Sequence, residues 1–303
     1  MDAEKNMELV KELIHGAYDL HVHTGPDVQE RKLHDLEMAQ RIIECGMAGY
    51  VIKSHYFCTA GRAGDVRTVY PQCETIGAVT LNNSVGGLNP VMVEMAARAG
   101  SRMIWMPSVD SAHERDYLAD CEDKKRPYWH RILSNIEASG VSCPGITLTD
   151  REGNLKKEVY DIIEIARKYS LCIATSHISH RETFAVAKAS MEMGMRRLLI
   201  THVLYPGTDY SLEEQKELVQ LGAFLEYSYS TFTTGKTSYE RTLENIKIIG
   251  PEHCIISSDL GMPIGESPEM GMLKFSSMLY ADGISEKMIH RMNRENTGYL
   301  VHE

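Results

Sequence analysis

Histidine and acidic side chains near the ends of apolar segments are the feature of this sequence that suggests chemistry. His21 and His23 flank a single valine in a segment with β-strand character, AYDLHVHT. Residues two apart on a strand point to the same face, separated by about 7 Å along the backbone. Two imidazoles placed in this way can converge on one metal ion. Asp19 shares their face, which would allow it to orient one of the ligands.

Three more side chains extend this set. His177 lies near the end of the segment ATSHIS, His202 near the end of LITHV, and Asp259 near the end of ISSDLG. Imidazole nitrogens and carboxylate oxygens are common ligands of Zn²⁺ and similar divalent ions. We therefore predict a divalent metal site, with zinc as the expected ion and one or two ions per chain. The alternative is that these are unrelated polar residues at strand ends, since a lone H-x-H pair occurs by chance.

Lys53 and His55 lie two residues apart in the next apolar segment, VIKSH, on one face with Val51. A lysine that points into a barrel is costly unless it is paired or modified. Three roles for Lys53 stay open: an ion pair with Asp19 or Asp259, a carbamylated bridge between two metal ions, or a cationic group for substrate binding or proton transfer. His55 is expected to be a metal ligand or a substrate contact.

Eight apolar segments that alternate with amphipathic patterns must position these residues. The predicted strands are residues 17–24, 49–55, 75–83, 101–109, 171–179, 196–203, 222–229 and 254–261. The predicted helices are residues 33–45, 90–99, 155–169, 183–193, 211–221 and 238–249. Strands that alternate with helices indicate parallel βαβ units, and eight such units predict an α/β fold of the (β/α)8 TIM-barrel type. We expect residues 1–303 to form a single domain of this kind.

One interval is longer than a βαβ unit. About 70 residues separate the fourth and fifth predicted strands, whereas one unit takes about 30. The excess, about residues 110–154, is polar, and we predict an insertion in the loop after strand four. Such loops lie on the face of a barrel that carries the active site. The insertion contains His113, His130 and the Tyr128-Trp129 pair, which are candidates to cover the site.

Four further residues are weaker candidates for substrate binding. Tyr227 and Tyr229 follow the seventh apolar segment, and Arg62 and Arg67 lie in the predicted loop after strand two. A tyrosine there could orient a substrate, and an arginine could hold an anionic group. The alternatives are packing for the tyrosines and structural or solvated roles for the arginines.

Composition excludes several classes of partner. The net charge is −10 and no basic run is present, so we expect no nucleic-acid partner. No apolar run reaches the length of a membrane span, and the charged N-terminus lacks an apolar signal core. Seven scattered cysteines without a C-x-x-C motif fit a reducing compartment. We expect a cytoplasmic protein that acts on a small molecule, and a homo-oligomer stays open.

The order of the candidate ligands resembles that of the amidohydrolase superfamily of metal-dependent hydrolases. The resemblance rests on His21-Val22-His23 at strand one, His177 at strand five, His202 at strand six and Asp259 at strand eight. It extends over about residues 17–300 and includes a closing segment, MNRENTGYL, that is similar to the usual last helix of the superfamily. The phrases DLHVHTGPD, KSHY and SSDLG indicate an uncharacterised branch, so no substrate carries over.

The resemblance implies how the metals would be held. In the binuclear form, the histidine pair and the strand-eight aspartate hold one ion, and the histidines of strands five and six hold the other. A carbamylated lysine or a glutamate on strand four often bridges them. This chain departs from that pattern, because SRMIWMPSVDS has neither residue and its nearest acid is Asp110.

The resemblance also implies an activity. A metal-activated water would attack an amide, lactone, ester or phosphoester, with Asp259 as the general base and His202 and Lys53 as further catalytic candidates. The absence of a bridging lysine or glutamate on strand four favours a second hypothesis, a mononuclear lyase such as a decarboxylase. In such an enzyme His202 would be an acid or base. A non-catalytic ligand-binding barrel is the third reading.

Overall fold

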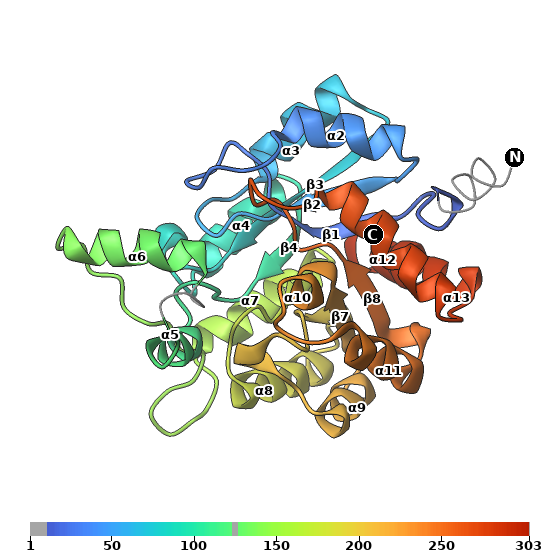
Figure 1. The fold of residues 1–303 in the computed structure, drawn as a ribbon. Helices are drawn as coiled ribbons and strands as arrows, with labels where there is room; N and C mark the ends of the chain where they lie inside the picture. The colour runs from blue at the N-terminus through green and yellow to red at the C-terminus, as the bar shows by residue number, and fades with distance from the viewer. Residues whose placement is uncertain (1–10, 123–126, 303) are drawn as a thin grey trace, which may run out of the picture.

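The chain folds as a closed barrel of parallel strands. The structure, a computed structural model, describes residues 11–122 and 127–302. Its eight strands pair in chain order, as Figure 1 shows. They are β1 (Tyr18–Val22), β2 (Gly49–Ile52), β3 (Glu74–Thr80), β4 (Ser101–Trp105), β5 (Cys172–Ala174), β6 (Leu198–Ile200), β7 (Phe224–Ser228) and β8 (Cys254–Ser257). The predicted TIM barrel is therefore confirmed.

Two backbone hydrogen bonds close the barrel between its first and last strands. The N–H of Asp259 donates to the carbonyl of His21 at 2.9 Å, and the N–H of His23 donates to the carbonyl of Leu260 at 2.9 Å. An isolated parallel bridge joins Val22 to Leu260. Three of the residues that form this closure are thus predicted metal ligands.

Helices surround the strands (Figure 1). They are α2 (Asp35–Glu44), α3 (Ala60–Val69), α4 (Pro90–Arg98), α5 (Ala112–Ala119), α6 (Tyr128–Ala138), α7 (Lys157–Lys168), α8 (His180–Glu192), α9 (Leu212–Gln220), α10 (Tyr229–Thr233), α11 (Tyr239–Ile249), α12 (Pro268–Ala281), α13 (Glu286–His290) and α14 (Asn296–Val301). A π-helical turn, η5 (Arg291–Glu295), precedes α14, and the 3₁₀ turns are η1 (Asn83–Val85), η3 (Pro206–Thr208) and η4 (Pro251–His253). None of the helices in the described ranges has the length and apolarity that a membrane crossing requires.

All six predicted helices are present, and capping signals in the sequence explain where two of them begin. Ser179 and Ser211 begin α8 and α9 with capping boxes, in which the serine hydroxyl and a glutamate three residues later satisfy each other's backbone N–H groups. Helix α3 was missed, and Arg62 and Arg67 therefore lie on a helix and not in a loop. Its segment AGRAGDVRTV contains two glycines and little apolar periodicity, so the sequence pattern does not predict a helix.

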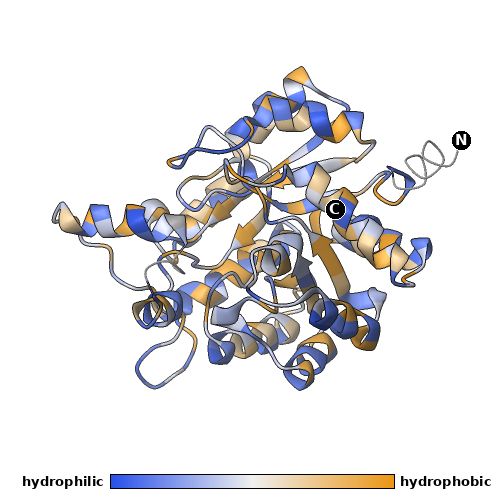
Figure 2. Cartoon of the chain, viewed as in Figure 1, coloured by the Kyte–Doolittle hydropathy of each residue, from blue (hydrophilic) through white to orange (hydrophobic). Residues whose placement is uncertain are grey.

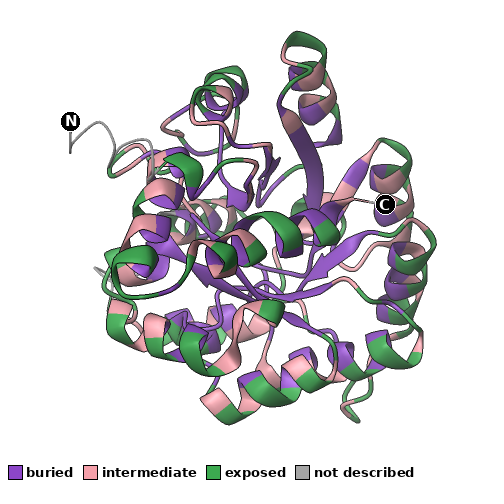
Figure 3. Cartoon of the chain, turned by 90° about the vertical axis from the view of Figure 1, so that its right-hand side faces the viewer, coloured by how far each residue is buried: buried purple, intermediate pink, exposed green. Residues whose placement is uncertain are grey.

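Side chains alternate between two apolar layers, which Figures 2 and 3 show as apolar, buried strands inside helices with polar, exposed outer faces. One layer fills the barrel interior, and α14 packs against it with Leu300 and Val301. The interior side chains from the strands include Leu20, Val51, Met103, Leu199 and Ile255. The other layer lies between strands and helices and includes Ile52, Ile104, Ile173, Ile200 and Ile256.

The predicted insertion after strand four is confirmed. Between β4 and the barrel helix α7, the chain forms the two helices α5 and α6. Figure 1 shows α6 extending outward from the side of the barrel. Trp129 of α6 and Leu118 of α5 pack with Val109 in a small apolar cluster of their own. This cluster holds the insertion against the rim of the barrel.

A β-bulge in β1 re-aims the first metal-ligand candidate. The register of β1 against β2 shifts between Asp19 and Val22. Leu20 packs in the barrel interior, and the next residue, His21, also lines the interior cavity. Strict alternation would put them on opposite faces, so the bulge supplies the required turn of the chain.

Close packing of α3 on β3 predicts a difference between two glycines. A Cβ at Gly77 would lie 2.6 Å from Ala60 Cα, whereas a Cβ at Gly64 of α3 would meet only the Arg67 guanidinium at 4.0 Å. We expect Gly77→Ala to lower the free energy of unfolding by about 1–3 kcal/mol through overpacking. Gly64→Ala should raise it by about 0.5–1 kcal/mol through helix propensity. Urea unfolding measures both, and a Gly77→Ala protein as stable as the wild type would contradict this packing.

Candidate metal centre

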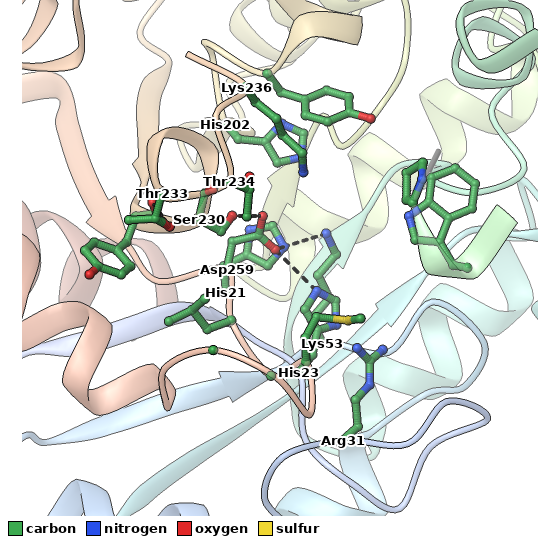
Figure 4. A pocket seen from close by; sticks show the side chains of 18 of the residues that line it. His21, His23, Arg31, Lys53, His202, Ser230, Thr233, Thr234, Lys236 and Asp259 are labelled. Carbon is green, nitrogen blue, oxygen red and sulfur yellow. Dashed lines mark hydrogen bonds and ion pairs between the residues drawn. The ribbon is translucent and has the colours of Figure 1, made fainter. Parts of the chain in front are cut away.

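His21, His23 and Asp259 meet at the carboxyl end of the barrel (Figure 4). Asp259 Oδ1 lies 3.0 Å from His21 Nε2 and 3.5 Å from His23 Nε2. One potential ligand atom from each of the three lies within 4.8 Å of the other two. Two imidazoles and a carboxylate at these separations are a donor set for one divalent ion. The structure thus brings together the first three predicted ligands.

His177 and His202 form a second pair beside this group. Their Nε2 atoms lie 3.2 Å apart, and the ring of His202 stacks 5.9 Å from that of His21. Behind His177, Glu114 Oε2 lies 3.0 Å from Nδ1, while Oε1 accepts the Tyr205 hydroxyl at 2.8 Å. This carboxylate lies at ion-pair distance behind the ring, and the other ring nitrogen, Nε2, faces His202 in the site. The insertion provides this carboxylate, because Glu114 belongs to α5.

Glu226 of β7 is a buried carboxylate that the sequence analysis missed. Its Oε1 lies 2.9 Å from His21 Nδ1 and accepts the Ser257 hydroxyl at 2.6 Å. Its Oε2 accepts the backbone N–H of His202 at 2.8 Å. One side chain thus holds residues from β1, β8 and the loop after β6. Alternation along β7 offered a signal, since Phe224 packs in the barrel interior and Glu226 is two residues later.

Burial and mutual contact set the charge states of these groups. Burial lowers the pKa of the His23 and His202 imidazoles well below their usual range, which favours the neutral form that binds metals. Burial, the largest single effect, opposes the charged form of His21, but the Asp259 and Glu226 carboxylates together raise the pKa of His21. The same contacts, against the effect of burial, hold the pKa of Asp259 well below its usual range. Asp259 is therefore a carboxylate.

The backbone is strained at two of the ligand candidates. His202 has φ +27° and Asp259 has φ +49°, and Ser176, next to His177, has φ +57°. Residues other than glycine rarely adopt a positive φ. Those that do cluster at functional sites, because the surrounding structure holds them in that conformation. The Ser230 hydroxyl adds to this restraint by donating to Asp259 Oδ2 at 2.7 Å.

Lys53 reaches the centre of the site and is only 1% exposed. Its Nζ lies 2.8 Å from His21 Nε2 and 4.0 Å from the ring centroid of Trp105. Within the described ranges, no carboxylate lies at ion-pair distance from Lys53, so the predicted alternative of a pair with Asp19 or Asp259 is wrong. Burial lowers the pKa of Lys53 to about 8.

The cluster forms the floor of a cavity of about 430 Å³. The predicted substrate contact His55 lines it, with its ring stacked 5.0 Å from that of His23 and its Nδ1 2.9 Å from the Ser108 hydroxyl. Trp129 from the insertion also lines it, its ring 6.4 Å from those of His55 and His177. Tyr229 lines the cavity and donates its hydroxyl to Glu266 at 2.9 Å.

Two predicted substrate contacts lie elsewhere. Tyr227 is buried in the layer behind the barrel and donates its hydroxyl to Gln215 of α9 at 2.7 Å, because alternation along β7 points it away from the site. Arg62 makes two hydrogen bonds to the Asp35 carboxylate, at 2.8 Å each, and one to the Thr24 carbonyl at 2.9 Å. Both predictions were wrong, since neither residue lines the cavity.

Other candidates also have structural roles. Arg67 donates to the Thr75 carbonyl, and His113 contacts the Gly207 carbonyl at 2.6 Å. Asp19 was expected to orient one of the imidazoles. Its carboxylate instead accepts the backbone N–H groups of His21 and Ser258. His130 contacts Ser134 on α6 and does not line the cavity. The side chain of its neighbour Tyr128 lies outside the described part of the structure.

A family model matches residues 16–226, from just before β1 to the middle of β7, and is described as a family of unknown function, DUF6282. The chain belongs to the DUF6282 family. The matched part of this DUF6282 protein includes His21, His23, His177, His202 and Glu226 and stops before Asp259. No curated protein matches the sequence at a significant level.

Solved structures resemble this DUF6282 protein over almost its whole length. An amidohydrolase from Pseudomonas aeruginosa aligns with a TM-score of 0.61 at 11% identity, covering 96% of this chain and 97% of the other. A lactonase from Listeria monocytogenes aligns with a TM-score of 0.61 at 10% identity, covering 97% and 96%. A probable dipeptidase from P. aeruginosa aligns with a TM-score of 0.59 at 12% identity, covering 98% and 97%. At these identities the likeness shows that this chain and the three proteins share a fold.

The contacts of the centre predict graded losses of metal. We expect His23→Ala to abolish tight binding of a divalent ion, because one of three converging donors is removed. Glu226→Gln should weaken binding about 10- to 100-fold, because His21 loses the carboxylate that orients it. His253→Gln is the matched control, since His253 precedes β8 at the opposite end of the barrel. Competition titration with a chelating dye gives the affinities, and tight binding by His23→Ala would contradict the assignment.

Proposed function

We propose that this protein is a metal-dependent hydrolase that cleaves an amide, lactone, ester or phosphoester bond of a small molecule. The observation that carries the proposal is the convergence of His21, His23 and Asp259 at the floor of a cavity, within 4.8 Å of one another. His177 and His202 face the same floor. The amidohydrolase and lactonase that share the fold support this reaction class by analogy alone.

The donor atoms fit a divalent ion such as zinc. His21 and His177 each have a carboxylate behind Nδ1, at 2.9 Å and 3.0 Å, which leaves Nε2 for a metal. The Nε2 atoms of His177 and His202 face each other at 3.2 Å, an arrangement that a shared cation would satisfy. A divalent ion in such a site lowers the pKa of a coordinated water toward about 7 and polarises the scissile carbonyl or phosphoryl group.

The side chains around the floor would transfer protons and orient the substrate. Asp259 is ionised, with Oδ2 fixed by Ser230, so it can accept a proton and return it to a leaving group. His55 and Trp129 line the wall and would orient the substrate. The insertion contributes Pro127 and Trp129 to the wall beside the histidines.

Turnover by the metal-loaded protein tests this proposal. We expect hydrolysis of simple esters or lactones by the zinc- or manganese-loaded chain, and a loss of at least about 100-fold in kcat/KM in Asp259→Asn. A His253→Gln protein should retain the wild-type rate. If the metal-loaded protein hydrolyses no amide, lactone, ester or phosphoester, the hydrolase proposal is contradicted and the ligand-binding alternative is favoured.

One observation favours a second candidate, a mononuclear lyase. Strand β4 ends in Trp105, which packs 4.7 Å from the His21 ring, where the superfamily pattern would place a bridging lysine or glutamate. With a single ion, His202 would be available as an acid or base. Metal analysis separates the candidates, because about two ions per chain supports the binuclear hydrolase and about one supports the lyase.

We further propose that Lys53 supplies the missing bridge as a carbamate. Its amine would attack CO2, a nitrogen–carbon bond would form, and the amine would lose a proton. The neutral amine that this needs is accessible, since burial lowers the pKa of Lys53 to about 8. Nζ lies 2.8 Å from His21 Nε2, which would place the new carboxylate among the ligands.

Bicarbonate dependence tests the carbamate. We expect metal loading of the wild type to rise with added bicarbonate, most strongly above about pH 8, where the amine is neutral. Lys53→Ala should lose the second ion and this dependence. A full metal complement in Lys53→Ala would rule out the bridge while leaving the first metal site intact.

A further inference from the structure

Lys236, in the loop after α10, is the one exposed cation on the cavity wall among the described residues that has no carboxylate partner. Arg31 also lines the wall, but its guanidinium donates to Asp27 at 2.7 Å and 2.9 Å, and both side chains are buried. Lys53 is held at the floor beside His21. The ammonium of Lys236 instead lies 5.0 Å above the ring centroid of Tyr205.

The carboxylates of the cavity do not neutralise Lys236. Asp259 contacts His21, His23 and Ser230, as described above. Glu266 accepts the Tyr229 hydroxyl and pairs with Lys274 of α12. Of the three cations on the wall, Arg31 is paired with Asp27 and Lys53 lies beside His21, so Lys236 is the one that remains available to a ligand.

The Tyr205 ring separates Lys236 from the candidate metal centre. The Tyr205 ring packs 4.9 Å from the His202 ring and 5.1 Å from the His177 ring. Figure 4 shows Lys236 on the His202 side of the cavity and Arg31 on the His23 side. A group held by Lys236 would therefore lie near the reacting centre without occupying it.

The rest of the wall suits an apolar segment. Trp129 packs against His55 and His177 on one side of the cavity. Met262 and Ile264 line another part of the wall, and Ile264 is 91% exposed. Ligand pockets are lined predominantly by apolar and aromatic side chains, and Trp129, Met262 and Ile264 provide such a lining here.

We propose that Lys236 binds an anionic group, a carboxylate in the first instance, at the end of the substrate away from the bond that is cleaved. The apolar part of the substrate packs between Trp129 and the Met262–Ile264 segment. This inference rests on the proposed hydrolase function and narrows its substrates to small anionic molecules with an apolar portion. The ammonium keeps its position by lying on the Tyr205 ring, so it is partly ordered before the anion binds.

Binding of a matched pair of compounds tests the anion site without requiring turnover. Hydrocinnamate carries a carboxylate, and hydrocinnamamide is its neutral counterpart. Calorimetric titration of the metal-loaded protein should show tighter binding of the acid, and Lys236→Gln should reduce this preference about fivefold. Coordination of the carboxylate to the metal does not involve Lys236, so an acid preference that is unchanged in Lys236→Gln would assign it to the metal and overturn the anion site. Lys188→Gln, at an exposed lysine of α8, is the control and should keep the wild-type preference.

Hydrolysis of two esters provides the second measurement. The ratio of kcat/KM for mono-p-nitrophenyl glutarate to that for p-nitrophenyl butyrate should fall about fivefold in Lys236→Gln, through KM, and be preserved in Lys236→Arg. A fall in the binding preference without turnover of either ester would refute the hydrolase but support the anion site. Turnover with an unchanged ratio would refute the anion site but support the hydrolase. Equal binding of acid and amide, or no binding of either, would also overturn the anion site.

Discussion

Closure of the barrel between β1 and β8 is the constraint on which the other features depend. The bonds that close it come from the backbone of His21, His23 and Asp259, so the first and last parts of the chain meet at the ligands themselves. Gly261 allows the loop after β8 to approach, since a Cβ there would lie 1.9 Å from the His23 carbonyl oxygen. The spacing of the ligands is therefore fixed by backbone hydrogen bonds at the strand ends, which restrain it more than a set of flexible loops would.

One end of the barrel interior is apolar and stabilises the fold, whereas the other end carries the candidate metal ligands. At one end, Leu300 and Val301 of α14 pack against an apolar interior. At the other, the buried Glu226 and the partly buried Asp259 lie among imidazoles, an arrangement that costs desolvation energy unless every charge has a partner. A bound cation would offset the two negative charges and the strained φ at Asp259. The apolar end stabilises the fold while the polar end keeps the donor atoms in place.

The fold could be predicted because eight apolar segments recur along the chain with six amphipathic helical patterns between them, and the ligands because each polar residue follows an apolar run. Contacts across space were not visible in this way. Glu114 comes from an irregular insertion, and its approach to His177 depends on how α5 packs. Arg62 was misread because its partner Asp35 lies on another helix. Strict alternation along β7 would have predicted Glu226 as the site residue in place of Tyr227, since the side chains of these two neighbours point in opposite directions.

The chain has two tryptophans, Trp105 and Trp129, and both lie at the centre. Trp105 packs against the Lys53 ammonium and the His21 ring, while Trp129 faces the histidines from the insertion. The tryptophan fluorescence of this protein, excited where tyrosine does not absorb, therefore originates from one residue on the cavity wall and one directly behind its floor. Quenching and shifts of the emission spectrum follow the occupancy of the centre and the position of the insertion directly, and no label needs to be introduced.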